Sequence, residues 1–375
     1  MSQMPAGPIP SLDGIRALAV SLVFFAHSGL DHIVPGGLGV TIFFVLSGYL
    51  ISTLMRIEFA ATHRIDYRGF YLRRFLRLMP PLFIVVALAG VLSTLSIIDG
   101  AFSTQGFWSV LLYFGNYFVI AHDFGGLPAG LGVVWSLAVE EHYYLFYPPL
   151  AALLLRTGRV GLSAKFLLTL CLAVLAWRCW LVMHGAAEEY LTMATDTRVD
   201  SILVGCLLAL WRNPWIDAAL TPNPVRDWFL IGLSTAVLLF TLIYRDDFFR
   251  LTYRYSLQSL AVVPLLYFAV AKAKQAPFCW LNAKPLVYIG TISYTVYLTH
   301  HAIFLMIEKH WPEVGWLVTT FATILITLAI AEPMRRWVEL PCARLRKRLH
   351  KSPRTAVMSQ TNSQPVATSA SRGML

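Results

Sequence analysis

Long apolar runs alternate with short polar segments along most of the 375-residue chain. A helix that crosses a bilayer needs about 20 mostly apolar residues. The candidates for such helices are ten runs: 15–33, 37–55, 80–98, 136–155, 165–183, 199–211, 228–244, 256–271, 286–307 and 314–332. The pattern predicts an all-α polytopic membrane protein with about ten transmembrane helices.

One further apolar stretch, 107–121, is shorter and is interrupted by glycine and asparagine. It could be an eleventh span or a re-entrant or interfacial segment. Segments on the cytoplasmic side carry an excess of Lys and Arg. Three segments are rich in basic residues: 56–77, 156–165 and 335–351. They all fall on the cytoplasmic side only if 107–121 does not cross the membrane. We therefore predict that 107–121 is re-entrant or interfacial, and that both termini are cytoplasmic.

The same pattern predicts one membrane domain over 1–340, followed by a tail over 341–375 that is first basic and then disordered. The tail from 352 onward is rich in Ser, Thr and Gln, a composition typical of disordered chain. The N-terminal segment lacks the positive region of a signal peptide, so we expect the first apolar run to be an uncleaved span.

Composition supports a membrane protein: the chain is 57% hydrophobic and 13% charged, and its mean hydropathy is +0.63. Soluble domains carry about a quarter charged residues. The net charge is +10, but the basic residues lie between apolar runs, which indicates orientation in a bilayer and no nucleic-acid partner. The five cysteines form no CxxC pair, so we expect neither a metal site nor a disulfide framework.

The first candidate site residues are Arg16 and His27, at the two ends of the apolar stretch RALAVSLVFFAH. Eleven residues are almost three helical turns and about 16 Å, so both side chains lie on about the same face. Polar side chains within a membrane helix usually line a cavity. Asp13, one turn earlier, is a candidate partner for Arg16. The predicted orientation places Arg16 at the cytoplasmic end and His27 in the outward half.

Two adjacent carboxylates, Glu140 and Glu141, interrupt the apolar run 136–155. Because a carboxylate in an apolar environment is costly, at least one of them should face the interior. The run begins at about the depth of His27 in the predicted orientation. A His27–carboxylate pair is therefore geometrically possible, and it would make the histidine a better general base.

Two further groups of polar side chains fall at a similar depth. Arg198 and Asp200 open the run 199–211, and Tyr294, Tyr297 and His300 lie within 286–307. Each group also has an ordinary structural interpretation, as interfacial aromatics or as an ion pair. Their convergence favours a site. We treat them as candidates for substrate contact, with Tyr294, Tyr297 and Ser136 as candidate oxyanion stabilisers.

Arginines recur in two of the connecting segments. Arg73, Arg74 and Arg77 precede two prolines, in a predicted cytoplasmic loop whose forked cationic surface suits phosphates. Plain orientation by positive charge is the alternative. The segment 244–254 carries three more arginines, yet the scheme places it outside. It is either an exception, partly offset by two aspartates, or a landing surface for an anionic sugar or phosphate.

Six motifs in order over residues 11–301 resemble those of the bacterial membrane acyltransferase-3 family of inner-membrane acyltransferases. They are SLDGIRALAV with Arg-x10-His, FFVLSGYLI, FYLRRFLRLMPP, WSLAVEEHYYLFYP, RVDSILVG and ISYTVYLTH. The resemblance covers nearly the whole chain apart from the tail. Some members carry a fused extracytoplasmic esterase-like domain, which we do not expect here.

The resemblance implies acyl transfer, commonly of acetyl, from cytoplasmic acyl-CoA (acetyl-CoA) to a hydroxyl of a cell-surface or exported glycan or glycolipid. It implies that His27 is the catalytic histidine, that Arg16 supports the donor, and that Arg73, Arg74 and Arg77 face the CoA phosphates. The expected location is the bacterial inner membrane. The acceptor, the acyl chain, the oligomeric state and the choice between direct transfer and an acyl-histidine stay open.

A proton-coupled transporter is the alternative function, since buried His, Glu and Arg also build proton relays. Such transporters often show inverted repeats and paired broken helices, and neither is visible in the sequence. A non-catalytic relative is a further alternative. We expect an enzyme.

Overall fold

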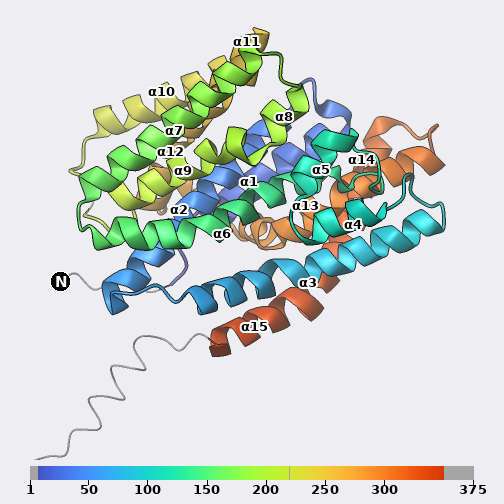
Figure 1. Ribbon diagram of the computed structural model, residues 1–375, viewed down its shortest axis with the longest axis horizontal. Helices are drawn as coiled ribbons and strands as arrows, with labels where there is room; N and C mark the ends of the chain where they lie inside the picture. Colours follow the sequence, from blue (N-terminus) through green and yellow to red (C-terminus); the bar gives the residue numbers. More distant parts are fainter. Residues whose placement is uncertain (1–6, 219, 350–375) are drawn as a thin grey trace, which may run out of the picture.

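The computed structural model describes residues 7–218 and 220–349, and within these ranges it contains helices and no strand (Figure 1). Each of the ten predicted runs lies on a long helix. These helices are α1 (Leu12–Phe25) continued by the π-helical turn η1 (Ala26–Leu30), α2 (Gly36–Thr62), α3 (Tyr67–Thr94), α6 (Trp135–Arg156), α7 (Val160–Met183), α9 (Thr195–Trp211), α10 (Pro224–Ile243), α12 (Tyr253–Ala271), α13 (Lys284–His310) and α14 (Trp316–Met334).

Seven helical segments are long and apolar enough to cross a membrane: Leu12–Leu30, Gly36–Thr62, Tyr67–Thr94, Val160–Met183, Pro224–Ile243, Tyr253–Ala271 and Trp316–Arg348. The other three long helices, α6, α9 and α13, carry most of the polar candidate residues, and α9 has only 17 residues. The protein is therefore an all-α membrane protein, as the apolar pattern predicts.

Shorter helices fill the connections: α4 (Thr104–Leu111), α5 (Gly115–His122), η2 (Leu131–Val134), α8 (Glu188–Met193), α11 (Asp247–Leu251), η3 (Phe278–Asn282), η4 (Arg335–Glu339) and α15 (Leu340–Leu349). The ambiguous stretch 107–121 forms α4 and α5, of eight residues each. Eight residues extend about 12 Å, well short of a bilayer core. Neither helix can cross alone.

The prediction of a loop around Arg73, Arg74 and Arg77 is wrong, because these residues lie in the first turns of α3. The Asp66 carboxylate caps the helix by accepting a hydrogen bond from the Gly69 N–H at 2.9 Å. Two prolines that seemed to mark a helix start instead lie inside α3. Membrane helices tolerate such prolines because neighbouring groups satisfy the freed carbonyls.

The basic segment that follows α14 is helical from 335 to 349, and α15 packs beside α3 along the lower edge of the molecule (Figure 1). The predicted disordered tail lies outside the described residues. Three arginines of α3 and the basic helix α15 therefore gather at the same end of the bundle.

Two pairs of helices approach unusually closely at glycines. A Cβ on Gly48 of α2 would lie 1.9 Å from the Ile202 carbonyl oxygen of α9, and one on Gly205 of α9 would lie 2.0 Å from the Val45 carbonyl oxygen. A Cβ on Gly290 of α13 would similarly lie 1.9 Å from a backbone oxygen of α1. Small residues of this kind let membrane helices pack backbone to backbone. These contacts fix α1, α2, α9 and α13 as the centre of the bundle.

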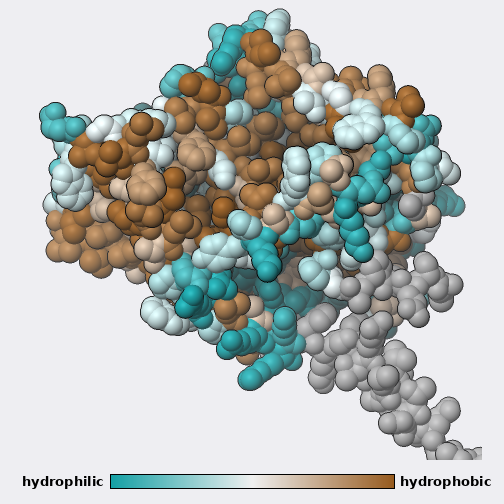
Figure 2. All heavy atoms as spheres, turned by 180° about the vertical axis from the view of Figure 1, so that it is seen from behind, coloured by the Kyte–Doolittle hydropathy of each residue, from teal (hydrophilic) through white to brown (hydrophobic). Residues whose placement is uncertain are grey.

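The outer surface is largely apolar. Figure 2 shows broad brown areas with hydrophilic side chains gathered in separate patches. On the outer helices α7 and α10 only 17% of the apolar window is buried, which leaves side chains such as Leu172 and Phe229 exposed. Exposed apolar area of this extent matches contact with lipid.

Candidate active site

His27 lies where α1 ends, on the π-helical turn η1. The chain leaves helical geometry directly afterwards, at Ser28 and at Gly29, whose φ is 83°. The indole N–H of Trp316 in α14 donates to the Ser28 carbonyl and holds this turn in place. Single π-helical turns occur frequently at functional sites. This turn is the local reason that the histidine projects into the bundle.

Three histidine rings meet at this point. The Nδ1 atom of His27 lies 2.9 Å from the Nε2 atom of His300 on α13. His301, the next residue of α13, stacks on His27 with ring centroids 4.4 Å apart and planes 15° from parallel. His300 is fully enclosed at 1% exposure, so its hydrogen bonds are all made within the protein.

The hydrogen bonds define which nitrogens carry protons when both rings are neutral. The Nδ1 atom of His300 lies 3.0 Å from the Val296 carbonyl and 2.9 Å from the Tyr297 carbonyl. A carbonyl only accepts, so this nitrogen is the donor and Nε2 of His300 is the acceptor. Nδ1 of His27 must then donate to it. The remaining ring nitrogen of His27, Nε2, keeps its lone pair.

A cavity opens beside this ring, which we call the His27 cavity. Its polar and aromatic lining residues are His27, Asp31, His32, Trp135, Thr241, Tyr244, Arg245, Arg250, Arg254, Tyr255, Gln258 and Tyr297. A further cavity that also borders His27 is lined by Phe124, Trp135 and His301 among others. The catalytic candidate thus borders two open spaces.

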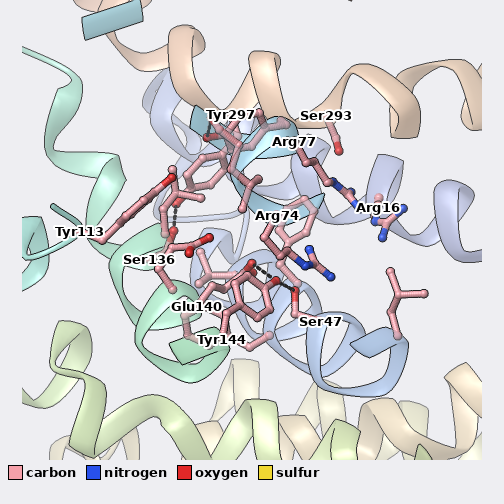
Figure 3. A pocket seen from close by; sticks show the side chains of 18 residues that line it. Arg16, Ser47, Arg74, Arg77, Tyr113, Ser136, Glu140, Tyr144, Ser293 and Tyr297 are labelled. Carbon is pink, nitrogen blue, oxygen red and sulfur yellow. Dashed lines mark hydrogen bonds between the residues drawn. The ribbon is translucent and has the colours of Figure 1, made fainter. Parts of the chain in front are cut away.

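A second cavity, the Arg74 cavity, is lined by most of the other predicted residues (Figure 3). Its polar and aromatic lining residues are Arg16, Phe43, Phe44, Ser47, Arg74, Arg77, Tyr113, Ser136, Glu140, Glu141, Tyr144, Ser293, Tyr294 and Tyr297. Arg16 bonds Asp13 at 2.7 Å, which confirms the predicted partner. Arginines from α1 and α3 therefore converge on one space.

Glutamates and a tyrosine organise the wall of the Arg74 cavity. The Tyr144 hydroxyl lies 2.8 Å from a Glu140 carboxylate oxygen and 3.2 Å from the Ser47 hydroxyl, and these contacts are drawn in Figure 3. The Arg74 guanidinium lies over the Tyr144 ring, 4.4 Å from its centroid. One carboxylate oxygen of Glu141 is buried without a hydrogen-bond partner.

The two cavities share a wall. Val40 and Tyr297 line both of them. The Tyr297 hydroxyl bonds the Ser136 hydroxyl at 2.7 Å and donates to the Val133 carbonyl at 3.0 Å. Arg16 and His27 lie on the same helix, one in each cavity. The cavities therefore follow one another along α1, and Tyr297 stands between them.

The predicted pairing of His27 with Glu140 or Glu141 is wrong in this structure, because His27 bonds His300 and Glu140 bonds Tyr144. The reason is depth along α6. Trp135, its first residue, lines the His27 cavity, and Glu140 follows about 7.5 Å further along the helix. That rise carries both carboxylates into the Arg74 cavity.

Other candidates lie outside the cavity linings, and Arg73 is the first of them. Arg73 points away from Arg74 and Arg77, toward Glu58 at 3.7 Å and Asp66 at 3.9 Å. These contacts explain why only two of the three arginines that were expected to face the CoA phosphates line the cavity.

Asp200 is enclosed in a buried ion pair with Arg178 at 3.0 Å and a hydrogen bond from Ser256 at 2.6 Å. Asp200 therefore belongs to a structural ion pair, the ordinary interpretation given above, but its partner is Arg178 and not Arg198. Arg198 itself donates to the Thr192 carbonyl at 2.7 Å, and its guanidinium lies 3.9 Å from the Tyr255 ring centroid. It supports the wall of the His27 cavity from behind.

Sequence reasoning missed several residues of this arrangement. His301 had a signal in its position beside His300, and Arg178 had one as a lone arginine within the apolar run 165–183. Tyr144 and Ser47 carried no charge to set them apart from ordinary interfacial or packing residues. Tyr294, which was predicted, donates to the Leu78 carbonyl at 2.8 Å and lines the Arg74 cavity.

Comparison with curated proteins finds relatives along most of the chain. It is 29% identical over 351 residues to the peptidoglycan O-acetyltransferase OatA of Listeria monocytogenes, covering 89% of this chain and 55% of the relative. It is also 29% identical to the putative peptidoglycan O-acetyltransferase YrhL of Bacillus subtilis, over 89% of this chain and 54% of the relative. The O-acetyltransferase OatA of Staphylococcus aureus gives 29%, with 89% and 57% covered.

The chain thus spans about half the length of these curated relatives. No solved structure matches it. The sequence model of the acyltransferase domain matches residues 9–332, which include every helix that lines the two cavities. On that match across most of its length, the chain belongs to the acyltransferase-3 family.

Proposed function

We propose that this protein is an integral inner-membrane O-acyltransferase. It moves an acyl group, acetyl in the simplest case, from acyl-CoA to a hydroxyl of a cell-surface or exported glycan. Family membership and relatives named as O-acetyltransferases support the reaction type. The single observation that carries the proposal is the Nε2 atom of His27, which keeps its lone pair in a cavity that adjoins an arginine-lined one.

The proposed topology has ten spans, with both termini in the cytoplasm and α4–α5 as the re-entrant or interfacial segment. The basic turns between the helices and the basic helix α15 support this orientation. The Arg74 cavity then belongs to the cytoplasmic half and the His27 cavity to the outward half. Donor and acceptor approach from opposite sides.

On the donor side, Arg16, Arg74 and Arg77 hold the phosphates of acyl-CoA. Guanidinium groups suit phosphates because their planar N–H groups form paired, charge-assisted hydrogen bonds. Glu140 and Tyr144 keep Arg74 in place, a role that replaces the one expected for Glu140 beside the base. The acyl end of the donor passes Tyr297 to reach His27.

At the junction, Nε2 of His27 accepts the proton of the acceptor hydroxyl as its oxygen attacks the thioester carbonyl. A carbon–oxygen bond forms, the carbon–sulfur bond breaks, and the proton passes to the leaving thiolate. His300 accepts the N–H of His27 and stabilises the protonated ring. Tyr297 and Ser136 are the proposed donors to the developing oxyanion, a role that requires the Tyr297 hydroxyl to turn away from the Val133 carbonyl that it bonds here. A two-step route through an acyl-histidine uses the same groups.

The test is the fate of labelled acetyl-CoA in membranes that contain the wild-type protein or His27→Ala, combined with mass spectrometry of surface glycans from the same cells. The proposal expects a labelled glycan with the wild type and none with the variant at equal protein level. Equal labelling by both would remove His27 from the mechanism. No acetyl-CoA consumption with any acceptor would favour a transporter.

A further inference from the structure

Three arginines line the His27 cavity from the α10–α12 connection, which we define as residues 244–254 and which includes the first turn of α12: Arg245, Arg250 and Arg254. None belongs to the motifs that identify the family. In the proposed topology they lie on the outward side, where the distribution of basic residues in membrane proteins does not favour them. Orientation of the chain therefore does not account for them, and their position beside His27 calls for another explanation.

The charge of this cavity is poorly balanced within the described residues. Asp31 is the one carboxylate that lines it, against the three arginines. Asp246 is occupied as the cap of α11, where it accepts from the Phe249 N–H at 2.8 Å. Asp247 reaches Arg250 only at 3.4 Å and is 87% exposed, so water screens that pair.

Individual donor groups are also left free. The Nε atom of Arg250 is buried without a hydrogen-bond partner. Arg254 is held against Tyr255, with one guanidinium nitrogen 3.1 Å from the phenol oxygen and the ring centroid 5.1 Å away. A buried N–H without a hydrogen-bond partner costs free energy of folding. A ligand that accepts a hydrogen bond from it would recover that cost.

The rest of the lining suits a sugar. Trp135, Tyr244 and Tyr255 present aromatic rings to the cavity. Gln258 donates to Thr241 at 3.2 Å, which leaves its carbonyl oxygen as an acceptor for a hydroxyl. Ligand sites typically combine such aromatic walls with a few polar groups that fix orientation.

We propose that the His27 cavity recognises its acceptor through an oxyanion, a carboxylate or a phosphate of the saccharide, which Arg245, Arg250 and Arg254 bind. The anion anchors the saccharide so that a nearby hydroxyl faces Nε2 of His27. This inference rests on the proposed function, since it names the class of acceptor for the same site.

Binding, measured without acetyl-CoA, separates this inference from the proposed chemistry. The protein in lipid nanodiscs is titrated with two matched pairs of probes. One pair is N-acetylglucosaminyl-N-acetylmuramic acid and its carboxyl methyl ester, and the other is phosphorylated N-acetylglucosamine and the free sugar. We expect at least one anionic probe to bind about tenfold more tightly than its neutral partner, the effect of one charge-assisted contact. The pair that shows the preference identifies the anion as carboxylate or phosphate.

The variants Arg245→Gln, Arg250→Gln and Arg254→Gln should each reduce that preference several-fold, and the triple variant should abolish it. Arg212→Gln, an exposed arginine at the far end of α9, is the matched control and should leave it unchanged. Equal binding of anionic and neutral probes, or no binding of either, overturns the inference. A preference that survives in the triple variant also overturns it. Acetyl-CoA turnover that depends on His27 reports on the proposed function independently.

Discussion

The Arg74 cavity and the His27 cavity both present three arginines, but they are built differently. In the Arg74 cavity the arginines lie on the long helices α1 and α3, and two glutamates of α6 face them. In the His27 cavity they lie on the short α10–α12 connection, against one aspartate. Residues on packed helices are held rigidly, whereas connections vary most among relatives.

In the proposed function, this difference matches what each cavity must recognise, the donor in one and the acceptor in the other. A donor common to a family needs one fixed site, and the motif residues Arg16, Arg74 and Glu140 lie accordingly on the long helices α1, α3 and α6. An acceptor that differs among members needs a site that can change without disturbing the bundle. The comparison therefore assigns the shared chemistry to the helices and the specificity to the α10–α12 connection.

The largest effect is expected at the point where the two cavities meet. His27→Ala should lower acetyl transfer by about 10²- to 10⁴-fold, the range for loss of a general base. Turnover of labelled acetyl-CoA by the purified protein measures it. His184→Ala, at an exposed histidine that ends α7, is the control. Transfer by His27→Ala at the wild-type rate would leave both cavities without a catalytic centre.

Removal of the partner of His27 should have a smaller effect. His300→Ala should lower kcat by about 10- to 100-fold, because His27 loses the acceptor that fixes its tautomer. His300→Gln supplies a carbonyl oxygen that can accept the same N–H and should recover part of the loss. If His300 served packing alone, both variants should lose kcat equally. Circular dichroism and the melting temperature would then show that both variants are also destabilised.

Substitution of the arginines that line the Arg74 cavity should change the KM for acetyl-CoA. Arg74→Ala and Arg77→Ala should each raise the KM for acetyl-CoA about tenfold, through loss of charge-assisted hydrogen bonds to phosphate. Binding of an acceptor analogue should not change. Arg73→Ala is the matched control, since Arg73 faces Glu58 and Asp66 instead of the cavity. Equal effects at Arg73 and Arg74 would show that general basic charge, and not the cavity, binds the donor.

The smallest effect is expected at the shared wall. Tyr297→Phe removes the hydroxyl that bonds Ser136 and the Val133 carbonyl but keeps the ring in place. Because Ser136 remains as the second proposed donor to the oxyanion, we expect the decrease in kcat to be that of one neutral hydrogen bond, roughly 3- to 10-fold. Steady-state kinetics with saturating acetyl-CoA tests it. An unchanged kcat would restrict Tyr297 to a purely structural role.

The helices were largely predictable because a bilayer imposes its thickness on the sequence. Each of the ten apolar runs lies on a long helix. The start of α3 was missed, since arginines and two prolines seemed to interrupt the helix, although Asp66 supplied a capping signal. Local composition therefore located the helices well and their polar ends less well.

The candidate site was predictable as a set of residues but not as a set of pairs. The helical period placed Arg16 and His27 on one face, and they line successive cavities along α1. Which group met His27 depended on the depth of α6 relative to α13, a tertiary quantity that spacing along one chain does not contain. For the same reason the partner of Asp200 was Arg178 of another helix and not the neighbouring Arg198.

The wall formed by Val40 and Tyr297 has a consequence for the cell as a whole. Two cavities that joined end to end across the bilayer would make a wet path, and protons would leak along it and dissipate the energy stored across the membrane. A tyrosine bonded to Ser136 and to a backbone carbonyl closes that path with few atoms. In the proposed function, Tyr297 keeps the two cavities apart until the acyl end of the donor moves past it and fills the gap, so the membrane stays electrically insulated.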